Sequence, residues 1–305
     1  MTEYIMQHGN SLSFPDNGQS WVILSDIEKA IKEKIEKIGK PLRDWDINIY
    51  RGILTGCNEA FIIDKEKRDE LIKKDAKSAE IIRPILRGRD IGRYQANFSN
   101  LYLINTHNGI ISKNIPPIEI KDYPAIKKHL DKYWTKINNR DDQGLTPYNL
   151  RSCAYMEDFS KQKILWAETM RIHKSDIMNF PRFGFTETDY FTDKTCFFAT
   201  GNHLYYILAY LNSSIGRYLC KRYVSILDNG GYLMQKVYLE PIPIIKPTDV
   251  VIKEIEIISK KIIEKQRNEY ENIINQKIFT LYDFRQEEIN YITKDNYEPL
   301  SNRKN

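Results

Sequence analysis

The chain has 305 residues, of which 41% are hydrophobic and 29% charged, and its formal net charge is +5. This composition is typical of a folded soluble protein, and it excludes a disordered chain or an integral membrane protein. The modest positive charge permits a nucleic-acid partner without requiring one. Because the four cysteines form no C-x-x-C pair and the five histidines lie far apart, we expect reduced thiols, no zinc site and a cytoplasmic location.

The first half of the chain predicts alternating helices and strands after an irregular leader over residues 1–20. Ser25 and Glu28 form a capping box, and the helix that begins there should end at Gly39 and Pro41. The elements expected next are strands over 47–63 with a turn at "TGCN", a charged helix over 65–75, a strand over 101–107 and an amphipathic helix over 121–134.

The second half predicts strands over 162–170 and 195–200, then a core helix over 204–219 that is too short and too polar to span a membrane. Three prolines in "EPIPIIKP" indicate a linker. A long charged helix should run from 251 towards 274, followed by a short helix over 284–292. The fold class is therefore α+β, with a leader (1–20), a body (21–245) and a small C-terminal helical appendage (246–305).

Motifs for catalysis are incomplete. The stretch "IYRGILTGCNEAFII" contains two glycines but neither glycine fingerprint for a nucleotide phosphate. A base-methylating enzyme needs a [DNS]-P-P-[YFW] loop, and the nearest match, "NIPPIE", has isoleucine at both working positions. Glu119 and Lys121 match half of a nuclease metal site, but no acid lies between Asp90 and Glu119. We expect no catalytic residue and no metal site, which favours a binding protein.

Basic side chains cluster in predicted loops, where sequence-reading residues commonly lie on a rigid body. Arginine suits bidentate hydrogen bonding to phosphates and to the major-groove edge of guanine. The candidates for DNA binding are Arg87, Arg89, Arg93, Arg140, Arg171, Lys174 and Arg182. The alternative for each of them is an ordinary salt-bridged surface residue.

Several motifs together resemble one known family. They are "GILTGCNEAF", "IIRPILRGRDIGRY", the "LNS" helix within "LAYLNSSIGRYL", "YLEPIPI" and the closing "IINQKIFTLYDFRQEEINYI". Over residues 21–295 the chain resembles the TaqI-like C-terminal specificity domain of fused adenine-specific methyltransferase restriction–modification proteins of type IIG. The resemblance implies a mixed-sheet target recognition domain over 21–245. It also implies that Gly52, Gly56 and Asn58 shape a turn, because glycine and asparagine tolerate positive φ.

The resemblance implies a function in sequence-specific recognition of double-stranded DNA. The chain would position a target adenine for an N6-adenine methyltransferase domain or subunit. S-adenosylmethionine, and Mg²⁺ for a nuclease domain, would then be bound by catalytic domains outside this chain. The arginines at 87, 89 and 93 belong to the shared motif, so we expect them to hold phosphates or brace the fold. Base readers are expected in 105–118, 139–150 and 170–185.

Two alternatives remain open at this stage. The first is a protein–protein docking module of the same system that does not read DNA by itself. It predicts weak, salt-insensitive behaviour with DNA and tight binding to a methyltransferase. The second is a nuclease that uses Glu119 and Lys121, which predicts Mg²⁺-dependent cutting by the isolated chain.

Overall fold

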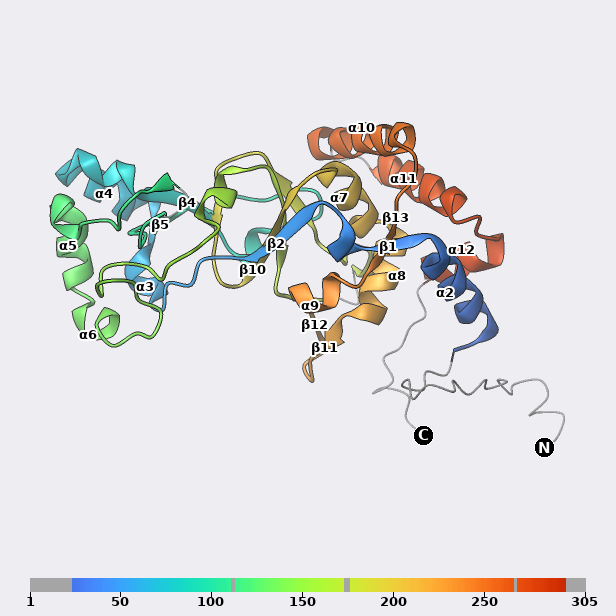
Figure 1. Cartoon of the computed structure of the whole chain (residues 1–305), viewed down its shortest axis with the longest axis horizontal. Coiled ribbons are helices and arrows are strands. Elements are labelled where there is room, and N and C mark those ends of the chain that lie inside the picture. The colour runs from blue at the N-terminus through green and yellow to red at the C-terminus, as the bar shows by residue number, and fades with distance from the viewer. Residues whose placement is uncertain (1–23, 111–112, 173–175, 266–267, 295–305) are drawn as a thin grey trace.

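A central antiparallel sheet lies between two lobes of an elongated molecule (Figure 1). The computed structural model describes residues 24–110, 113–172, 176–265 and 268–294. The sheet consists, in spatial order, of β2 (Ile47–Arg51), β10 (Cys196–Gly201), β6 (Lys163–Ala167) and β8 (Gly184–Thr186).

Both faces of the central sheet are covered, and each face belongs to a different hydrophobic core. Side chains alternate between the two faces of a strand. Ile164 and Trp166 of β6 therefore pack into one core, and Leu165 packs into the other. On β10, Phe197 and Phe198 divide in the same way. The central sheet therefore separates the two hydrophobic cores and contributes side chains to both.

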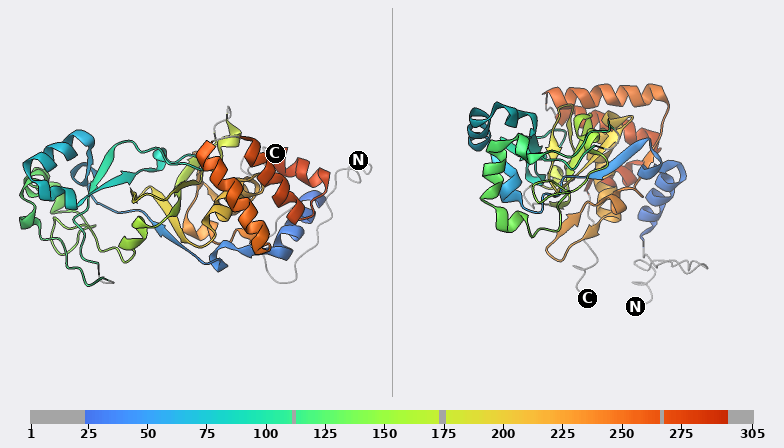
Figure 2. Two further views of the ribbon diagram at one scale, coloured as in Figure 1. Left: turned by 90° about the horizontal axis from the view of Figure 1, so that it is seen from above. Right: turned by 60° about the vertical axis from the view of Figure 1, so that its left-hand side comes forward.

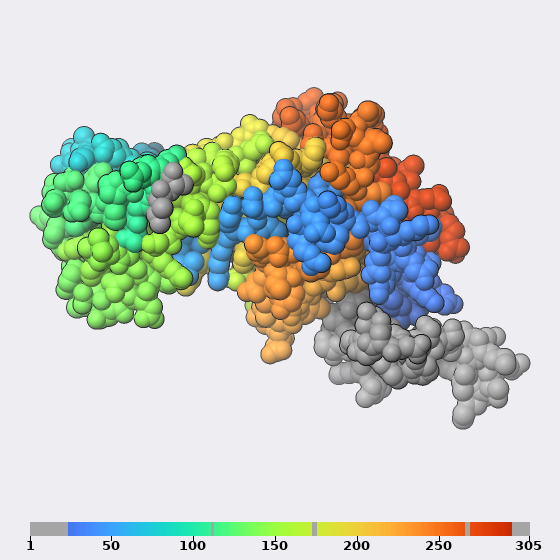
Figure 3. All heavy atoms as spheres, viewed as in Figure 1, coloured from blue at the N-terminus to red at the C-terminus, as the bar shows by residue number. Residues whose placement is uncertain are grey.

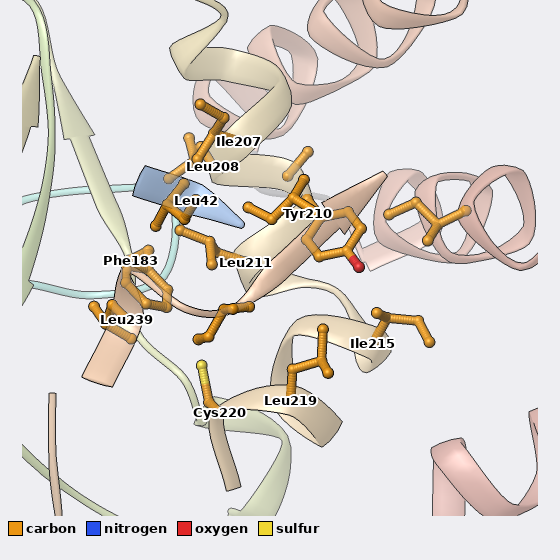
Figure 4. Close-up of a cluster of buried hydrophobic side chains, with 14 of the residues drawn as sticks. Leu42, Phe183, Ile207, Leu208, Tyr210, Leu211, Ile215, Leu219, Cys220 and Leu239 are labelled. Carbon is orange, nitrogen blue, oxygen red and sulfur yellow. The ribbon is translucent and has the colours of Figure 1, made fainter. Parts of the chain in front are cut away.

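The helical lobe covers one face of the sheet and contains the larger core. It comprises α2 (Asp26–Ile38), α7 (Leu204–Asn212), α8 (Ser214–Tyr223), α9 (Lys236–Leu239), α10 (Asp249–Lys265), α11 (Asn268–Leu281), α12 (Gln286–Lys294) and a two-stranded sheet of β1 (Gly39–Pro41) and β13 (Pro243–Ile245). In Figure 4 the side chains of Leu208, Tyr210 and Leu211 from α7 lie among those of Leu42 and Leu239, from distant parts of the chain.

The distal lobe covers the other face with a mixed sheet and helices. Its sheet has the order β3 (Ile62–Asp64), β5 (Leu101–Ile104), β4 (Ile82–Leu86) and β9 (Phe191–Thr192), and only the β4–β9 pair is parallel. Its helices are α3 (Asn58–Phe61), α4 (Lys65–Lys74), α5 (Pro124–Asp131) and α6 (Trp134–Ile137). Figure 2 shows this lobe at the end of the molecule away from α10, α11 and α12.

A fourth sheet, which contains a hairpin, projects from the helical lobe. It has the order β11 (Ser225–Ile226), β12 (Gly231–Leu233) and β7 (Thr169–Arg171), all antiparallel. Short 3₁₀ turns complete the described chain: η1 (Leu42–Asp44), η2 (Ala76–Glu80), η3 (Gly88–Asp90), η5 (Ile120–Asp122), η6 (Met156–Ser160) and η7 (Ile177–Asn179).

The α+β class and the strongest local predictions are confirmed. The N–H of Glu28 donates to the Ser25 hydroxyl, and the Ser25 N–H donates to the Glu28 carboxylate, which completes the capping box of α2. The charged helix after 64, the helix that begins at Pro124 and the strands at 101, 163 and 196 are also present. The leader over 1–20 lies outside the described residues.

Four predicted elements differ from the structure. The expected helix over 204–219 is divided because Ser213 is extended and its hydroxyl caps α8 by accepting from the Gly216 N–H. The expected helix from 251 is divided into α10 and α11. The proline-rich "linker" is wrong, since Pro243–Ile245 is buried and pairs with Gly39–Pro41 as a strand. One helical turn, α3, interrupts the strand expected after the "TGCN" turn.

The C-terminal helices share the core of the body. Ile252 and Ile255 of α10 and Ile274 and Ile278 of α11 lie in the same hydrophobic cluster as α7. The division at 245/246 stays a prediction. α10 begins at Asp249 and packs directly against α7.

Candidate nucleic-acid interface

The two lobes are joined at a narrow connection that we call the waist, formed by residues 51–57, 86–91, 168–171 and 191–196. In Figure 3 the outline of the molecule narrows between the distal lobe, in green, and the hairpin, in orange, that projects from the helical lobe. The first of these segments is the blue chain that runs from β2 to α3 in Figure 1. The waist therefore places both lobes and the hairpin around one recessed surface.

The first and last segments of the waist cross in direct main-chain contact. Gly52 N–H donates to the Cys196 carbonyl (2.9 Å), and Ile53 N–H donates to the Thr192 carbonyl (2.7 Å). A Cβ atom on Gly52 would lie 1.9 Å from the Asp193 carbonyl oxygen. Glycine is required at position 52 because the other segment passes where a side chain would stand.

The predicted positive-φ turn is found at one of its three residues. Gly56 has φ +65°, whereas Gly52 and Asn58 do not have positive φ. Asn58 instead begins α3, and its side-chain oxygen accepts a hydrogen bond from the Thr55 hydroxyl at 2.5 Å. Close packing explains the glycine at position 52, and Asn58 is explained by its place at the start of α3. The expectation that a residue tolerating positive φ is needed therefore holds only for Gly56.

Two of the candidate arginines lie at the turn η3 of the waist, Arg87 just before it and Arg89 within it. Arg87 is held in place, since its N–H donates to the Asp90 carboxylate (2.8 Å) and its guanidinium donates to the Ser99 hydroxyl (3.3 Å). Arg89 is exposed, and its guanidinium has no partner within the described ranges. Both line an open hollow of about 540 Å³ together with Asn58 and Thr195.

A further arginine at the waist, Arg51, was not among the candidates. Its guanidinium donates to both carboxylate oxygens of Glu168 (3.0 Å each) and to the Lys194 carbonyl (3.1 Å), and it lies over the Phe197 ring. Gln235 also donates to Glu168 (2.9 Å). Arg51 thus fixes the waist to the end of β6. In the sequence, Arg51 directly precedes Gly52 in the glycine-containing stretch, and this position is the signal by which it could have been chosen as a candidate.

Lys194 is a second residue that sequence reasoning missed. It is exposed, and in the part of the chain that the structure describes its ammonium group makes no hydrogen bond or ion pair. It precedes Thr195, whose hydroxyl accepts from the Gly88 N–H at 3.1 Å. Lys194 and Arg89 therefore belong to adjoining segments of the waist.

The third cluster of candidates lies beside the hairpin. Arg171 ends β7 opposite Gly231, is exposed, and has no side-chain partner among the described residues. Arg182 is half-buried and donates to the carbonyls of Arg171 (3.3 Å) and Asn179 (3.1 Å), and burial lowers the pKa of its guanidinium. Arg182 holds the segment that carries Arg171. Lys174 lies outside the described residues.

Arg140 requires a correction. Its side chain is 6% exposed and lies over the Phe61 ring, and its guanidinium donates to the carbonyls of Thr55, Pro147 and Asn149. Burial lowers the pKa of Arg140 to about 10. A guanidinium enclosed by carbonyls cannot reach a phosphate, so the structure contradicts the expectation that Arg140 contacts DNA. Its role is to hold the 139–150 loop against the distal lobe.

Arg93 has the bracing role that the sequence left open. Its guanidinium donates to the carbonyls of Pro181 (3.1 Å) and Asn212 (2.9 Å) and pairs with Glu271 of α11. One side chain thereby joins the segment after η3, the break between α7 and α8, and the C-terminal helices. The tightness of this network leaves little of Arg93 for an external partner.

Comparison with known families places the chain. A family profile described as the TaqI-like C-terminal specificity domain matches residues 83–244, more than half of the sequence. The chain belongs to this family. The match includes η3, Arg171, Lys194 and the hairpin, and it begins after the Gly52 crossing. No curated protein sequence matches this specificity domain.

One solved structure shows the same fold at low sequence identity. The type IIL restriction–modification enzyme MmeI, solved in complex with DNA, matches with a TM-score of 0.63 at 14% identity over 84% of this chain and 36% of its own. The type IIG restriction endonuclease BpuSI matches with a TM-score of 0.49 at 13% identity over 84% of this chain and 33% of its own. This chain covers about a third of the length of these two enzymes.

The residues considered for a nuclease site lie apart from the waist segments. Glu119 and Lys121 of the specificity domain are exposed and pair with each other at 3.6 Å. Within the described ranges no group of three or more His, Cys, Asp and Glu side chains could hold a metal ion. Among the helices described, none combines the length and apolar content that crossing a bilayer requires.

Proposed function

We propose that this chain is a sequence-specific, double-stranded DNA recognition module of a restriction–modification system. The observation that carries the proposal is a group of three exposed cationic side chains, Arg89, Arg171 and Lys194, on adjoining segments of the waist. None of the three has a hydrogen-bond or ion-pair partner in the described part of the chain. Unpaired cations on a recessed surface suit the phosphates of a duplex.

The family and fold support the same proposal. The chain belongs to a family of specificity domains, and it shares its fold with an enzyme whose structure was solved with DNA bound. Phosphate contacts set the position of a protein on a duplex, and contacts to base edges set the sequence preference. We assign Arg89, Arg171 and Lys194 to the first task, with Arg87 beside them. We assign the contacts to base edges to the lobes and the hairpin on either side of the waist.

The finer proposal concerns catalysis outside this chain. An adenine must leave the base stack before its N6 amine can be methylated, so the enzyme needs the duplex held in one register. We propose that residues 21–245 provide this register for an adenine-specific methyltransferase domain or subunit. The helices after 246 support the body: α10 and α11 pack against α7, and α12 packs against α8 and α2. S-adenosylmethionine would be bound by the methyltransferase, and Mg²⁺ by any nuclease domain of the same system.

The experiment is a comparison of two charge-matched triple variants. One replaces Arg89, Arg171 and Lys194 by alanine. The other replaces Lys253, Lys261 and Lys265 by alanine, which are exposed on α10, at the far side of the helical lobe from the hairpin in Figure 1. Both variants lose three positive charges, so a change in net charge alone affects them equally.

Affinity for duplex DNA is measured against salt concentration for the full chain and both variants. Each phosphate contact contributes about 0.9 to the magnitude of the slope of log K against log salt. The slope of the waist variant should therefore be smaller by about 2.7, and that of the α10 variant should be almost unchanged. Equal slopes for the two variants would reject the waist as the DNA surface. Weak, salt-insensitive binding by the unmodified chain would favour a protein-docking module instead.

A further inference from the structure

The base of the β11–β12 hairpin is rigidly anchored. β12 pairs with β11 on one side and with β7 on the other. The ring of Tyr232 packs against that of Phe180 at 4.7 Å between centroids. Trp166, from the central sheet, donates its indole N–H to the carbonyl of the buried Met234 at 2.8 Å. The orientation of the hairpin is therefore set by the core of the helical lobe.

The tip of the same hairpin, residues 227–230, projects into solvent beyond the half-buried Leu227. The turn is closed by Leu227 N–H donating to the Gly231 carbonyl and Gly230 N–H donating to the Leu227 carbonyl, both at 2.8 Å. Gly230 has φ +76°, and no atom lies within 4 Å of the place where its Cβ would stand. Asp228, Asn229 and Gly230 are exposed. The exposed tip is therefore carried on a rigid base, and a binding site on a rigid element is held more precisely than one on a free loop.

Several polar groups of the tip have no partner in the part of the chain that the structure describes. The Asn229 side-chain oxygen accepts from the Gly231 N–H at 3.1 Å, which leaves its amide donors for an external acceptor. Neither carboxylate oxygen of Asp228 accepts a hydrogen bond from any residue that the structure describes. On the adjacent strand, Arg171 stands opposite Gly231. An unpaired acid, an amide and an unpaired arginine are therefore within one small projecting sheet.

An acid on a DNA-facing surface has a restricted choice of partners. Phosphates repel a carboxylate, whereas the amino groups of cytosine N4 and adenine N6 donate to it in the major groove. That groove is about 12 Å wide and admits a two-stranded ribbon. We propose that the hairpin tip enters the major groove and that Asp228 is a specificity-determining residue that accepts from a base amino group, with Asn229 beside it. This inference rests on the DNA-recognition function proposed above.

The test is selection from a randomised duplex pool with the full chain, repeated with Asp228→Asn, Asn229→Ala and Glu33→Gln. Glu33 is an exposed acid on α2 without a described partner, so its variant controls for the loss of one negative charge. The affinity of each variant for a scrambled duplex is measured in parallel, and circular dichroism establishes that each is folded.

Two effects of opposite sign are expected for Asp228→Asn. Discrimination at one or two adjacent base positions should fall by about 10-fold, since a base contact contributes that order of preference. Affinity for the scrambled duplex should rise on the order of twofold, because a charge that repels phosphates is removed. Asn229→Ala should relax the same or the neighbouring position. If the tip served only to stabilise the hairpin, Asp228→Asn would not lower base discrimination and raise affinity for the scrambled duplex together.

The remaining outcomes are distinguishable. If the unmodified chain selects a motif and Asp228→Asn selects it with the same preferences, the hairpin inference is overturned while the proposed function stands. If the unmodified chain binds every duplex alike, the affinities of the two charge variants for the scrambled duplex decide. Equal affinities of Asp228→Asn and Glu33→Gln overturn the inference, whereas a higher affinity of Asp228→Asn supports a tip that faces DNA. Salt-insensitive, weak binding by all four proteins would reject the proposed function together with the inference.

Discussion

The crossing at Gly52 predicts that one methyl group at this position destabilises the waist. In Gly52→Ala the new Cβ would lie 1.9 Å from the Asp193 carbonyl oxygen and 2.6 Å from that of Thr192. Both obstacles are main-chain atoms, so no side-chain rotation relieves the overlap and the two segments must separate. Because the overlap is with main-chain atoms at 1.9 Å, we take the upper end of the ~1–3 kcal/mol range for overpacking, and loss of the Gly52–Cys196 hydrogen bond adds about 1 kcal/mol. Lower entropy of the unfolded chain offsets up to ~1 kcal/mol, which leaves an expected net loss of about 3 kcal/mol.

The assay is urea unfolding of the full chain followed by circular dichroism, with Gly92→Ala as the matched control. At Gly92 the new Cβ would meet Gln95 alone, its side chain at 3.4 Å and its carbonyl oxygen at 3.8 Å, which are ordinary contacts, and φ is not positive. We expect the control to change the unfolding free energy by less than ~0.5 kcal/mol. If both variants unfold at the same urea concentration with the same slope, the two segments do not cross as tightly as described, and the reasoning is refuted.

Three further predictions concern stability. Arg140→Ala leaves three carbonyl groups without their guanidinium donor and should lower the unfolding free energy by about 3 kcal/mol or more, whereas an equally stable variant in urea would show that Arg140 is not an interior brace. Lys163 is buried with its ammonium on the carbonyls of Phe159, Lys161 and Thr188, and burial lowers its pKa to about 8 from 10.5. Since the unfolded chain keeps this proton up to higher pH, stability should rise as pH increases from 8 towards 10.5. Relative to Lys163→Met, the wild type should gain about 2 kcal/mol between pH 7 and 9.5, and parallel pH profiles would contradict the assignment. Ser25→Ala removes the acceptor that caps α2 and should cost about 1 kcal/mol, measured as a lower melting temperature than that of Ser301→Ala, a serine near the end of the chain.

The rigidity of the waist has a consequence for recognition. The Arg51–Glu168 pair and the Arg93 network tie the waist to the central sheet and to the C-terminal helices. If the waist holds phosphates as we propose, a surface fixed in this way loses little conformational entropy on binding, so more of its contact energy remains as affinity. We expect substitutions at Arg93 to weaken DNA binding indirectly, together with stability.

Some features were predictable because their causes are local in the chain. The capping box at Ser25 and Glu28 and the proline at the first turn of α5 depend on residues within one turn of each other. The apolar run of β6 was readable because a strand that is buried on both faces has few polar positions. The hairpin at 225–233 was also readable: "DNGG" between apolar residues is a hairpin signal, and it was missed.

By itself, then, the amino-acid sequence determined the elements with local signals, the α+β class and the family. Tertiary structure decided the rest, because the deciding partners are far apart in the chain. Arg140 is an interior side chain only because Thr55, 85 residues away, presents its carbonyl to it. Pro243–Ile245 is a strand only because Gly39–Pro41 lies beside it. Gly52 meets a main chain about 140 residues later. The segments that carry Arg89, Arg171 and Lys194 adjoin only because Gly88 and Glu168 both hydrogen-bond to Thr195. Local physics acts within a few residues, whereas burial and proximity depend on the whole fold.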